Sequence, residues 1–376
     1  MRTTIIDAAH NLLRIALIVG ALPLLAAAQE RLDRDAWISK GIMPKVGAKM
    51  EGEATDVDTT KWEIGWVSKD VKDDMLFVEG DAPKGWIKRD QILTDDEAIA
   101  YYTALIDHGE HLAWAYHMRA IVWKCNGKID RAISDFGERL RIEPSAFIYD
   151  QRADRLRVNE EYDKAIADCD EAIALDPKNV RFYSTRAFSW LAKKEFDKAI
   201  GDCNQMIQLD PSNSVAYFCR GRAWIGKNES DKAIADFDEA IRLDPKYAAA
   251  YSDRGNLRES RKEYDKAIAD YQHAAETIPY FAQLQNQVAW LQATCPDARY
   301  RDGERAVAAA RKACRLSHDA FCIDTLAAAY AEAGNFKLAV EWQEEAIRLN
   351  SNDTEFVKGA NDRLALYRAG KPYHQE

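Results

Sequence analysis

The chain has 376 residues, with 52 lysine and arginine residues against 62 aspartate and glutamate residues, and carries a formal net charge of −10. An acidic balance argues against binding to a nucleic-acid backbone, which depends on clustered basic side chains. The sequence contains no nucleophile elbow, no H-E-x-x-H pair, no phosphate-binding loop and no dinucleotide fingerprint, the motifs that mark many enzymes. It therefore predicts no catalytic residue and no cofactor.

Residues 1–28 are predicted to be a secretory signal peptide. Arg2 and Arg14 flank the start, residues 15–25 form an apolar run, and small residues end the segment at Ala28. This order is typical of such signals. An uncleaved anchor is the alternative, but the run is shorter than the roughly 20 residues of a membrane-spanning helix. We expect cleavage after Ala28, a periplasmic or secreted chain, and no transmembrane span in the mature protein.

Residues 36–93 are predicted to form a small β-barrel. Trp62, Ile64 and Trp66 alternate with other residues, and residues 81–85 have turn chemistry. Short alternating segments separated by Gly, Pro and Asp indicate β-strands joined by tight turns.

The end of this segment, Gly85-Trp86-Ile87 followed by Ile92-Leu93, is similar to the closing strand of bacterial SH3-like domains. The resemblance implies an SH3-like barrel. Because so small a barrel needs bulky side chains to fill it, we expect four tryptophans in its core rather than on a ligand-binding face: Trp37, Trp62, Trp66 and Trp86.

Residues 94–112 are predicted to form a helix that precedes a repeated unit. Thr94-Asp95-Asp96-Glu97 has the pattern of a capping box, which marks the start of a helix. Ala98, Tyr102 and Leu105 would then share one face of an N-terminal half-repeat.

From residue 113 to residue 351 the sequence repeats with a period of about 34 residues. Three series of small residues and prolines recur at this spacing: Ala153, Ala187, Gly221 and Gly255; Ala165, Ala199, Ala233 and Ala267; Pro177, Pro211, Pro245 and Pro279. The period predicts a stack of helical hairpins. Small residues let two helices approach closely, and a proline ends the second helix of each hairpin. In one unit we expect helices over residues 146–159 and 163–175.

This pattern resembles the tetratricopeptide repeat (TPR), with its small residues in both helices, an aromatic residue in the second helix and a closing proline. Phe136, Phe237 and Tyr271 occupy the aromatic position, whereas two units carry Cys169 and Cys203 there. The resemblance implies an α+β chain that is mainly an all-α, right-handed TPR solenoid of about seven units, preceded by the β-barrel. The last units also look like those of many bacterial TPR proteins, including exported planctomycete-type ones.

The repeat is interrupted near residues 294–303, where Pro, Asp and Gly residues indicate an inserted loop. Residues 353–370 are predicted to form a polar-faced capping helix. Residues 371–376 are expected to be a loose tail.

The acidic runs at residues 168–171 and 236–239 are interpreted as a solvated outer surface. The seven cysteines leave at least one thiol unpaired, and a disulfide between Cys295 and Cys314, near Cys322, stays open as an alternative to free thiols. We expect no metal site, because three nearby histidines do not share one helix face: His108, His111 and His117.

The TPR resemblance implies a concave groove lined by the second, fifth, ninth and twelfth positions of each unit. Aromatic and arginine side chains, which dominate binding hot spots, are frequent there. The predicted groove residues are Trp114, His117, Ile121, Phe147, Asp150, Asp154, Arg157, Arg181, Ser184, Phe188, Val215, Phe218, Arg222, Ile225, Ser252 and Asn256. The alternative for the aromatic residues is packing between neighbouring units.

We therefore predict a non-catalytic scaffold in the cell envelope that binds a protein or peptide in this groove and does not bind nucleic acid. The alternative is an envelope-targeting module in which residues 36–93 bind peptidoglycan or another wall ligand. An enzyme with unrecognised chemistry is a third hypothesis.

Overall fold

The computed structural model describes residues 92–375 continuously, and also the backbone of five short segments: residues 41–44, 50–51, 66–72, 75–79 and 85–88. The predicted signal peptide lies outside the described residues, and so do Trp37, Trp62 and the side chains of Trp66 and Trp86. The chain divides into two compact units, residues 1–177 and 178–376, and each is described by itself.

The strands of the first unit pair into one antiparallel sheet with the order β2-β5-β4-β3-β1-β6. They are β1 (Gly41–Pro44), β2 (Met50–Glu51), β3 (Trp66–Lys72), β4 (Met75–Glu79), β5 (Gly85–Lys88) and β6 (Ile92–Thr94). Strand β1 pairs with β6 in a register that sets Met43 opposite Leu93. The assignment of this sheet to an SH3-like barrel stays a prediction.

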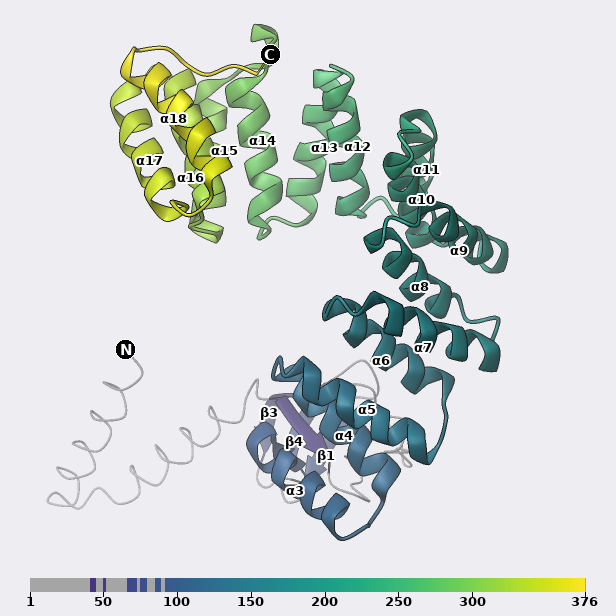
Figure 1. Cartoon of the computed structure of the whole chain (residues 1–376). Helices are drawn as coiled ribbons and strands as arrows, with labels where there is room; N and C mark the ends of the chain where they lie inside the picture. The colour runs from purple at the N-terminus through teal and green to yellow at the C-terminus, as the bar shows by residue number, and fades with distance from the viewer. Residues whose placement is uncertain are drawn as a thin grey trace, which may run out of the picture. The chain divides into compact units, whose positions relative to one another are not determined.

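The helices of the first unit follow the sheet (Figure 1). They are α3 (Asp95–Asp107), the pair α4 (Leu112–Cys125) and α5 (Ile129–Ile142), and the pair α6 (Ala146–Val158) and α7 (Tyr162–Leu175). Leu93 of β6 is buried with Tyr102 of α3 and Met118 of α4. Helix α3 therefore joins the sheet to the first pair.

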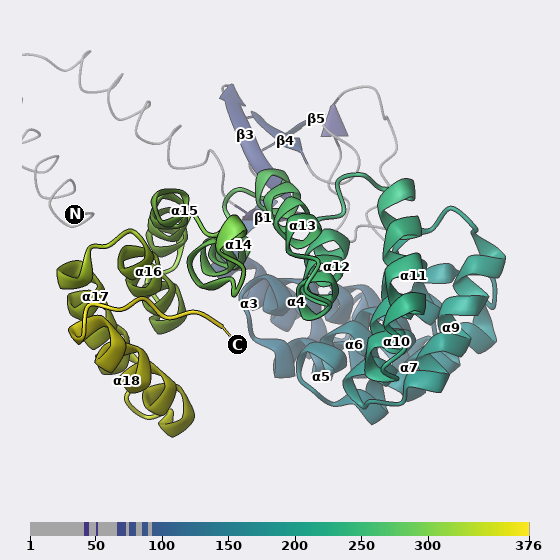
Figure 2. The same cartoon turned by 90° about the horizontal axis from the view of Figure 1, so that it is seen from above.

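The second unit consists of five further pairs and a last helix (Figure 2). They are α8 (Val180–Ala192) with α9 (Phe196–Leu209), α10 (Ser214–Gly226) with α11 (Ser230–Leu243), α12 (Ala248–Ser260) with α13 (Tyr264–Thr277), α14 (Ala282–Thr294) with α15 (Gly303–Leu316), α16 (Ala320–Glu332) with α17 (Phe336–Leu349), and α18 (Thr354–Arg368). Sixteen α-helices lie within the described residues. The insertion between α14 and α15 contains a single 3₁₀ turn, η3 (Ala298–Tyr300).

The two helices of a pair approach closely through the predicted small residues. A Cβ atom added to Gly221 would lie 2.6 Å from Cε1 of Phe237, and one added to Gly255 would lie 2.6 Å from Cε1 of Tyr271. Both distances are shorter than carbon–carbon contact. An alanine at position 221 or 255 would therefore force the facing ring, Phe237 or Tyr271, to move.

Directly beside each close contact, an arginine of the first helix forms a paired hydrogen bond with an aspartate of the second. The described helices contain five such pairs, each joining residues 16 apart: Arg119–Asp135, Arg152–Asp168, Arg186–Asp202, Arg220–Asp236 and Arg254–Asp270. The ten nitrogen–oxygen distances lie between 2.6 and 3.0 Å. The hydrogen bond that each arginine donates to its aspartate raises the pKa of Arg119, Arg152 and Arg220 above the ordinary value of an arginine.

These pairs correct one prediction from the sequence. Asp168 and Asp236 were expected on a solvated outer surface, but their exposed fractions are only 5 % and 6 %. The reason is that each carboxylate is neutralised by an arginine on a different helix, and a buried charge needs such a partner.

Three of these arginines also reach the helix that precedes their own pair. Arg119 donates to Thr103 of α3, Arg220 donates to Asn204 of α9, and Arg254 donates to Asp238 of α11. One guanidinium thus connects three helices. These three arginines therefore fix the position of their pair on the preceding helix as well as the two helices within the pair.

We predict that Gly221→Ala and Gly201→Ala have opposite effects on stability. The new methyl group at position 221 meets the Phe237 ring and should lower the free energy of unfolding by about 1–3 kcal/mol. Gly201 lies exposed in α9, and its added methyl group meets nothing within 4 Å, so the same change there should raise stability by about 0.5–1 kcal/mol. Urea or thermal denaturation measures both. Equal stabilisation by the two variants would contradict the close packing at Gly221.

We also predict that Asp236→Asn destabilises the second unit, because it removes the charge that neutralises Arg220. The expected loss is about 1.5–3 kcal/mol, the range for a hydrogen bond to a charged group. The control is Glu239→Gln, which breaks an exposed pair with Arg242 on the same helix and should cost less than about 1 kcal/mol. Similar losses for the two variants in thermal denaturation would show that the buried pair has no special role.

Candidate functional site

In the first unit, the structure buries three of the predicted groove residues. His117, Ile121 and Asp150 are exposed by only 6 %, 1 % and 1 %. His117 lies between the rings of Phe136 and Phe147, at centroid distances of 6.1 and 6.2 Å. Their placement in a binding groove is therefore wrong, because these side chains face the neighbouring helices rather than solvent.

The other predicted residues of this unit are half-buried. Trp114 packs edge-on against Tyr102, with a centroid distance of 5.3 Å, and Phe147 contacts His117. Asp154 forms ion pairs with Arg155 and Arg157. Burial alone would raise the pKa of Asp154, but the Arg157 hydrogen bond and the Arg155 charge together lower it. Asp154 is thus ionised near neutral pH.

In the second unit, Phe218 requires the same correction. Its side chain is 6 % exposed and packs between Phe237, at a ring-centroid distance of 5.9 Å, and Tyr247 of the next pair, at 4.9 Å. Phe218 was expected to contact a partner, but its side chain is buried beneath the surface and is not accessible to one. The remaining predicted residues are half-buried or exposed: Arg181, Ser184, Phe188, Val215, Arg222, Ile225, Ser252 and Asn256.

Three of these residues belong to one column of side chains that recurs every 34 residues on successive first helices. The column consists of Phe188 on α8, Arg222 on α10, Asn256 on α12 and Trp290 on α14. Arg222 and Asn256 are exposed, whereas Phe188 and Trp290 are half-buried. Trp290 was not among the predicted groove residues, although its 34-residue distance from Asn256 was a sufficient signal.

Arg222 is the centre of this column. Its guanidinium lies 5.9 Å from the Phe218 ring centroid, and its Nε atom lies 3.7 Å from Oδ2 of Asp253. The Arg222 side chain is still 52 % exposed. Burial raises the pKa of Asp253, and the positive charge of Arg222 opposes that shift. Arg222 is therefore a positioned cation that can still accept a partner from solvent.

Beside Asn256, a chain of hydrogen bonds connects α12, α13 and α14. Ser252 donates to the Gln287 side-chain oxygen at 2.9 Å, and Gln287 donates to Asn256 at 3.2 Å. The Tyr271 hydroxyl lies 2.8 Å from the Asn256 oxygen and 2.7 Å from Glu259. Ser252 and Asn256, which the sequence predicted for the groove, are thus held by polar contacts.

The segment that follows α18, residues 371–375, is not loose. It is named the return segment here, because it runs from the end of α18 back toward α14 (Figure 1). Its Gln375 amide donates to the Thr294 carbonyl of α14 at 2.8 Å. The expectation of a loose tail is therefore wrong for these residues, because the return segment forms defined contacts with earlier first helices.

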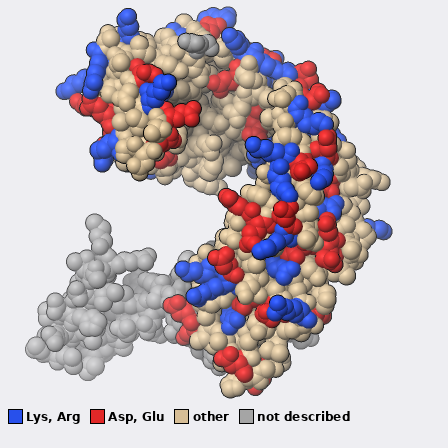
Figure 3. All heavy atoms as spheres, viewed as in Figure 1, with Lys and Arg blue, Asp and Glu red and all other residues tan. Residues whose placement is uncertain are grey.

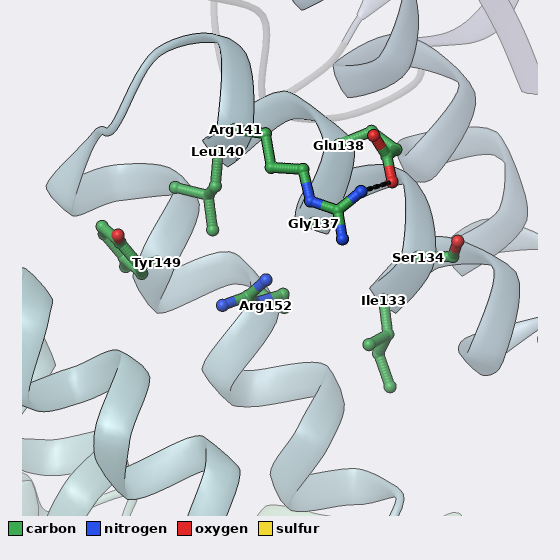
Figure 4. Close-up of a pocket in the computed structure, with 8 residues that line it drawn as sticks. All are labelled: Ile133, Ser134, Gly137, Glu138, Leu140, Arg141, Tyr149 and Arg152. Carbon is green, nitrogen blue, oxygen red and sulfur yellow. Dashed lines mark hydrogen bonds and ion pairs between the residues drawn. The ribbon is translucent and has the colours of Figure 1, made fainter.

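A hollow of about 400 Å³ lies between α5 and α6 of the first unit, lined by Gly137, Arg141, Tyr149 and Arg152 among others (Figure 4). In later pairs, Asn204 and Asp238 occupy the position that Gly137 occupies here, and each accepts a hydrogen bond from an arginine. Glycine offers no such side chain. The hollow is therefore a local gap between neighbouring pairs.

The described residues contain no group of three or more His, Cys, Asp or Glu that could bind a metal ion. Within the same part of the chain, no helix is long and apolar enough to span a membrane. On the face that Figure 3 shows, basic and acidic side chains are interspersed over the described helices.

All seven cysteines have free thiols, so the structure forms no Cys295–Cys314 disulfide. The Cys314 thiol instead donates to the Cys322 carbonyl oxygen at 3.2 Å. Burial raises the pKa of Cys314 to about 11 and that of Cys322 to about 12. These thiols are protonated near neutral pH, and the reactive form of cysteine is the thiolate.

Models of one repeat family match the helical pairs. Two models, each described as tetratricopeptide repeat, cover residues 151–214, 220–280 and 324–353. These parts of the chain are TPR repeats, as the sequence predicted. A comparison with curated proteins found no match.

Solved structures with similar folds include other TPR proteins. A tetratricopeptide repeat protein from Parabacteroides merdae is 19 % identical, with a TM-score of 0.48, over 71 % of this chain and 98 % of that one. Yeast Tom70 is 18 % identical, with a TM-score of 0.55, over 73 % of this chain and 59 % of its own. YrrB, described as a TPR protein with an unusual peptide-binding site, is 18 % identical, with a TM-score of 0.42, over 52 % of this chain and 97 % of its own. At these identities the likeness concerns the fold alone.

Proposed function

We propose that this chain is a non-catalytic scaffold that binds an extended protein segment along the Phe188–Arg222–Asn256–Trp290 column. The observation that carries the proposal is the placement of Arg222. It is exposed, lies over an aromatic ring and is held beside a carboxylate. Arginine and aromatic side chains supported in this way are typical of binding hot spots.

The chemistry of the column indicates the class of partner. Phe188 and Trp290 offer apolar contacts at the two ends, while Arg222 and Asn256 offer a cation and an amide between them. A peptide that carries apolar side chains on either side of an acidic or amide side chain fits this order. Because the four positions recur on parallel first helices, an extended segment can contact them in succession.

We predict that Arg222→Glu reduces peptide binding at least about tenfold, which corresponds to a loss of about 1.4 kcal/mol. Peptides are first selected from a phage-displayed library on the intact protein, and their affinities are then measured by fluorescence anisotropy. The control is Arg242→Glu, the same charge reversal on the second helix α11, where Arg242 is paired with Glu239. Thermal denaturation checks that both variants are folded. Equal binding by the two variants, or no selected peptide at all, would overturn the proposed site.

We also propose export to the cell envelope, on the strength of residues 1–28. The polypeptide recovered from the periplasm or medium of expressing bacteria should begin at Gln29, as N-terminal sequencing can show. Ala28→Lys should block cleavage, because a large charged side chain does not suit the cleavage position. Retention of Met1 on a cytoplasmic protein would contradict export.

The second candidate function is wall binding by residues 36–93. It is supported by the antiparallel sheet and by the predicted signal peptide that precedes it. Sedimentation with purified peptidoglycan separates the two functions, because wall binding should be indifferent to Arg222→Glu. Absence of the protein from the pellet would remove this candidate.

A further inference from the structure

The return segment begins at a sharp turn after α18. Gly370 has φ +68°, in the left-handed region that favours glycine. The Gly370 amide donates to the Tyr367 carbonyl, and the Lys371 amide donates to the Leu366 carbonyl, both at 3.0 Å. This end is typical of a helix that stops at a glycine. The turn directs Pro372 and the residues after it away from the α18 axis.

The aromatic side chain of the return segment covers one end of the column. The Tyr373 ring lies 6.1 Å from the Trp290 ring between centroids. The Arg363 guanidinium of α18 lies 5.6 Å from the Tyr373 centroid and 5.7 Å from the Trp290 centroid. An arginine over two neighbouring rings stabilises their contact through cation–π attraction. Tyr373 and Arg363 thus contribute to the burial of Trp290, which also packs against the buried residues around Ala289.

The next two residues bind acidic side chains of two other first helices. His374 Nε2 lies 2.7 Å from Oε2 of Glu332, the last residue of α16. Gln375 Nε2 donates to Oε1 of Glu259 on α12 at 3.4 Å. Glu332 is itself held by Arg301 of the insertion, whose Nε lies 2.9 Å from Oε1.

A backbone hydrogen bond completes the contact. The Gln375 amide donates to the carbonyl of Thr294, the last residue of α14. Such terminal carbonyls have no partner within their own helix. The return segment thus uses one aromatic contact, two polar side-chain contacts and one backbone hydrogen bond, all to α12, α14 and α16, together with the Arg363 contact from α18. These are the contacts that a bound extended peptide would make.

We propose that residues 371–375 are an intramolecular ligand of the column at its Trp290 end. A partner peptide that reaches this end must displace them, and the peptide that fits best carries an aromatic side chain followed by a cationic or amide side chain. Trp290 and Arg363 receive the aromatic ring, and Glu332 and Glu259 receive the following two residues. The inference rests on the proposed function, because it assigns an occupant to the same surface.

The test adds the labelled peptide Lys-Pro-Tyr-His-Gln, the sequence of residues 371–375, to the full chain and to a chain that ends at Gly370. Because an attached segment competes at a high effective concentration, the shortened chain should bind the peptide on the order of tenfold or more tightly than the full chain. The peptide with alanine in place of tyrosine should not bind either chain. Equal binding of the tyrosine peptide to both chains, or binding to neither, would overturn the proposal.

A second variant guards against loss of folding in the shortened chain. Tyr373→Ala in the full chain removes the aromatic contact without shortening the protein, and it should also increase binding of the added peptide. Glu332→Gln in the shortened chain should weaken that binding, whereas Glu345→Gln, in an exposed pair with Arg348 on α17, should leave it unchanged.

The peptide library described above distinguishes two proposals: that the column binds peptides, and that the return segment is its ligand. If library peptides bind through Arg222 with equal affinity to the full and shortened chains, the column is a binding site and the return segment is not its ligand. If neither chain selects a peptide from the library, the column itself is not a binding site.

Discussion

The register between the two helices of each pair is the constraint on which the rest of the structure depends. Two interactions set it at adjacent positions. Gly221 meets the Phe237 ring, and one residue earlier on each helix Arg220 binds Asp236. The apolar contact tolerates no added atom, and the ion pair tolerates no shift along the helix, because an unpaired buried charge is costly. A slip by one residue would therefore break both at once.

The same register determines which side chains face a partner. Arg220, Gly221 and Arg222 are consecutive, and an α-helix turns about 100° per residue. Once the first binds the second helix and the next meets its aromatic ring, the third must point to the free side of the first helix. The repeats of Arg222 and Asn256 place a side chain of the column by this rule, and Phe188 and Trp290 occupy the same position at the 34-residue spacing. The column is thus a consequence of packing, and only the identities of its side chains are free to vary.

This distinction explains what the sequence could predict. The hairpins followed from the 34-residue period, and α7, α9 and α11 end two residues before the prolines that the sequence provides. The burial of Phe218 could not be predicted from the sequence of its own unit, because the residue that covers it, Tyr247, belongs to the next pair. Asp236 was predicted to be exposed because it lies in an acidic stretch of sequence. The arginines that recur in the first helices with the same 34-residue period were a signal for its burial. The return segment was unpredictable, because the residue that receives Tyr373 lies more than two repeats earlier in the sequence.

The return segment binds where the repeat loses its regularity. The regular arginine–aspartate pairs end with Arg254–Asp270, and other contacts replace them among the described residues: Arg311 with Tyr330, Arg301 with Glu332 and Arg363 with Asp324. Two of these arginines serve the return segment, since Arg301 positions the Glu332 carboxylate and Arg363 covers the Tyr373 ring. Departures from a consistent local pattern tend to coincide with functional sites. The insertion after α14 therefore has a physical role: it supplies the arginine that orients an acidic side chain toward the return segment.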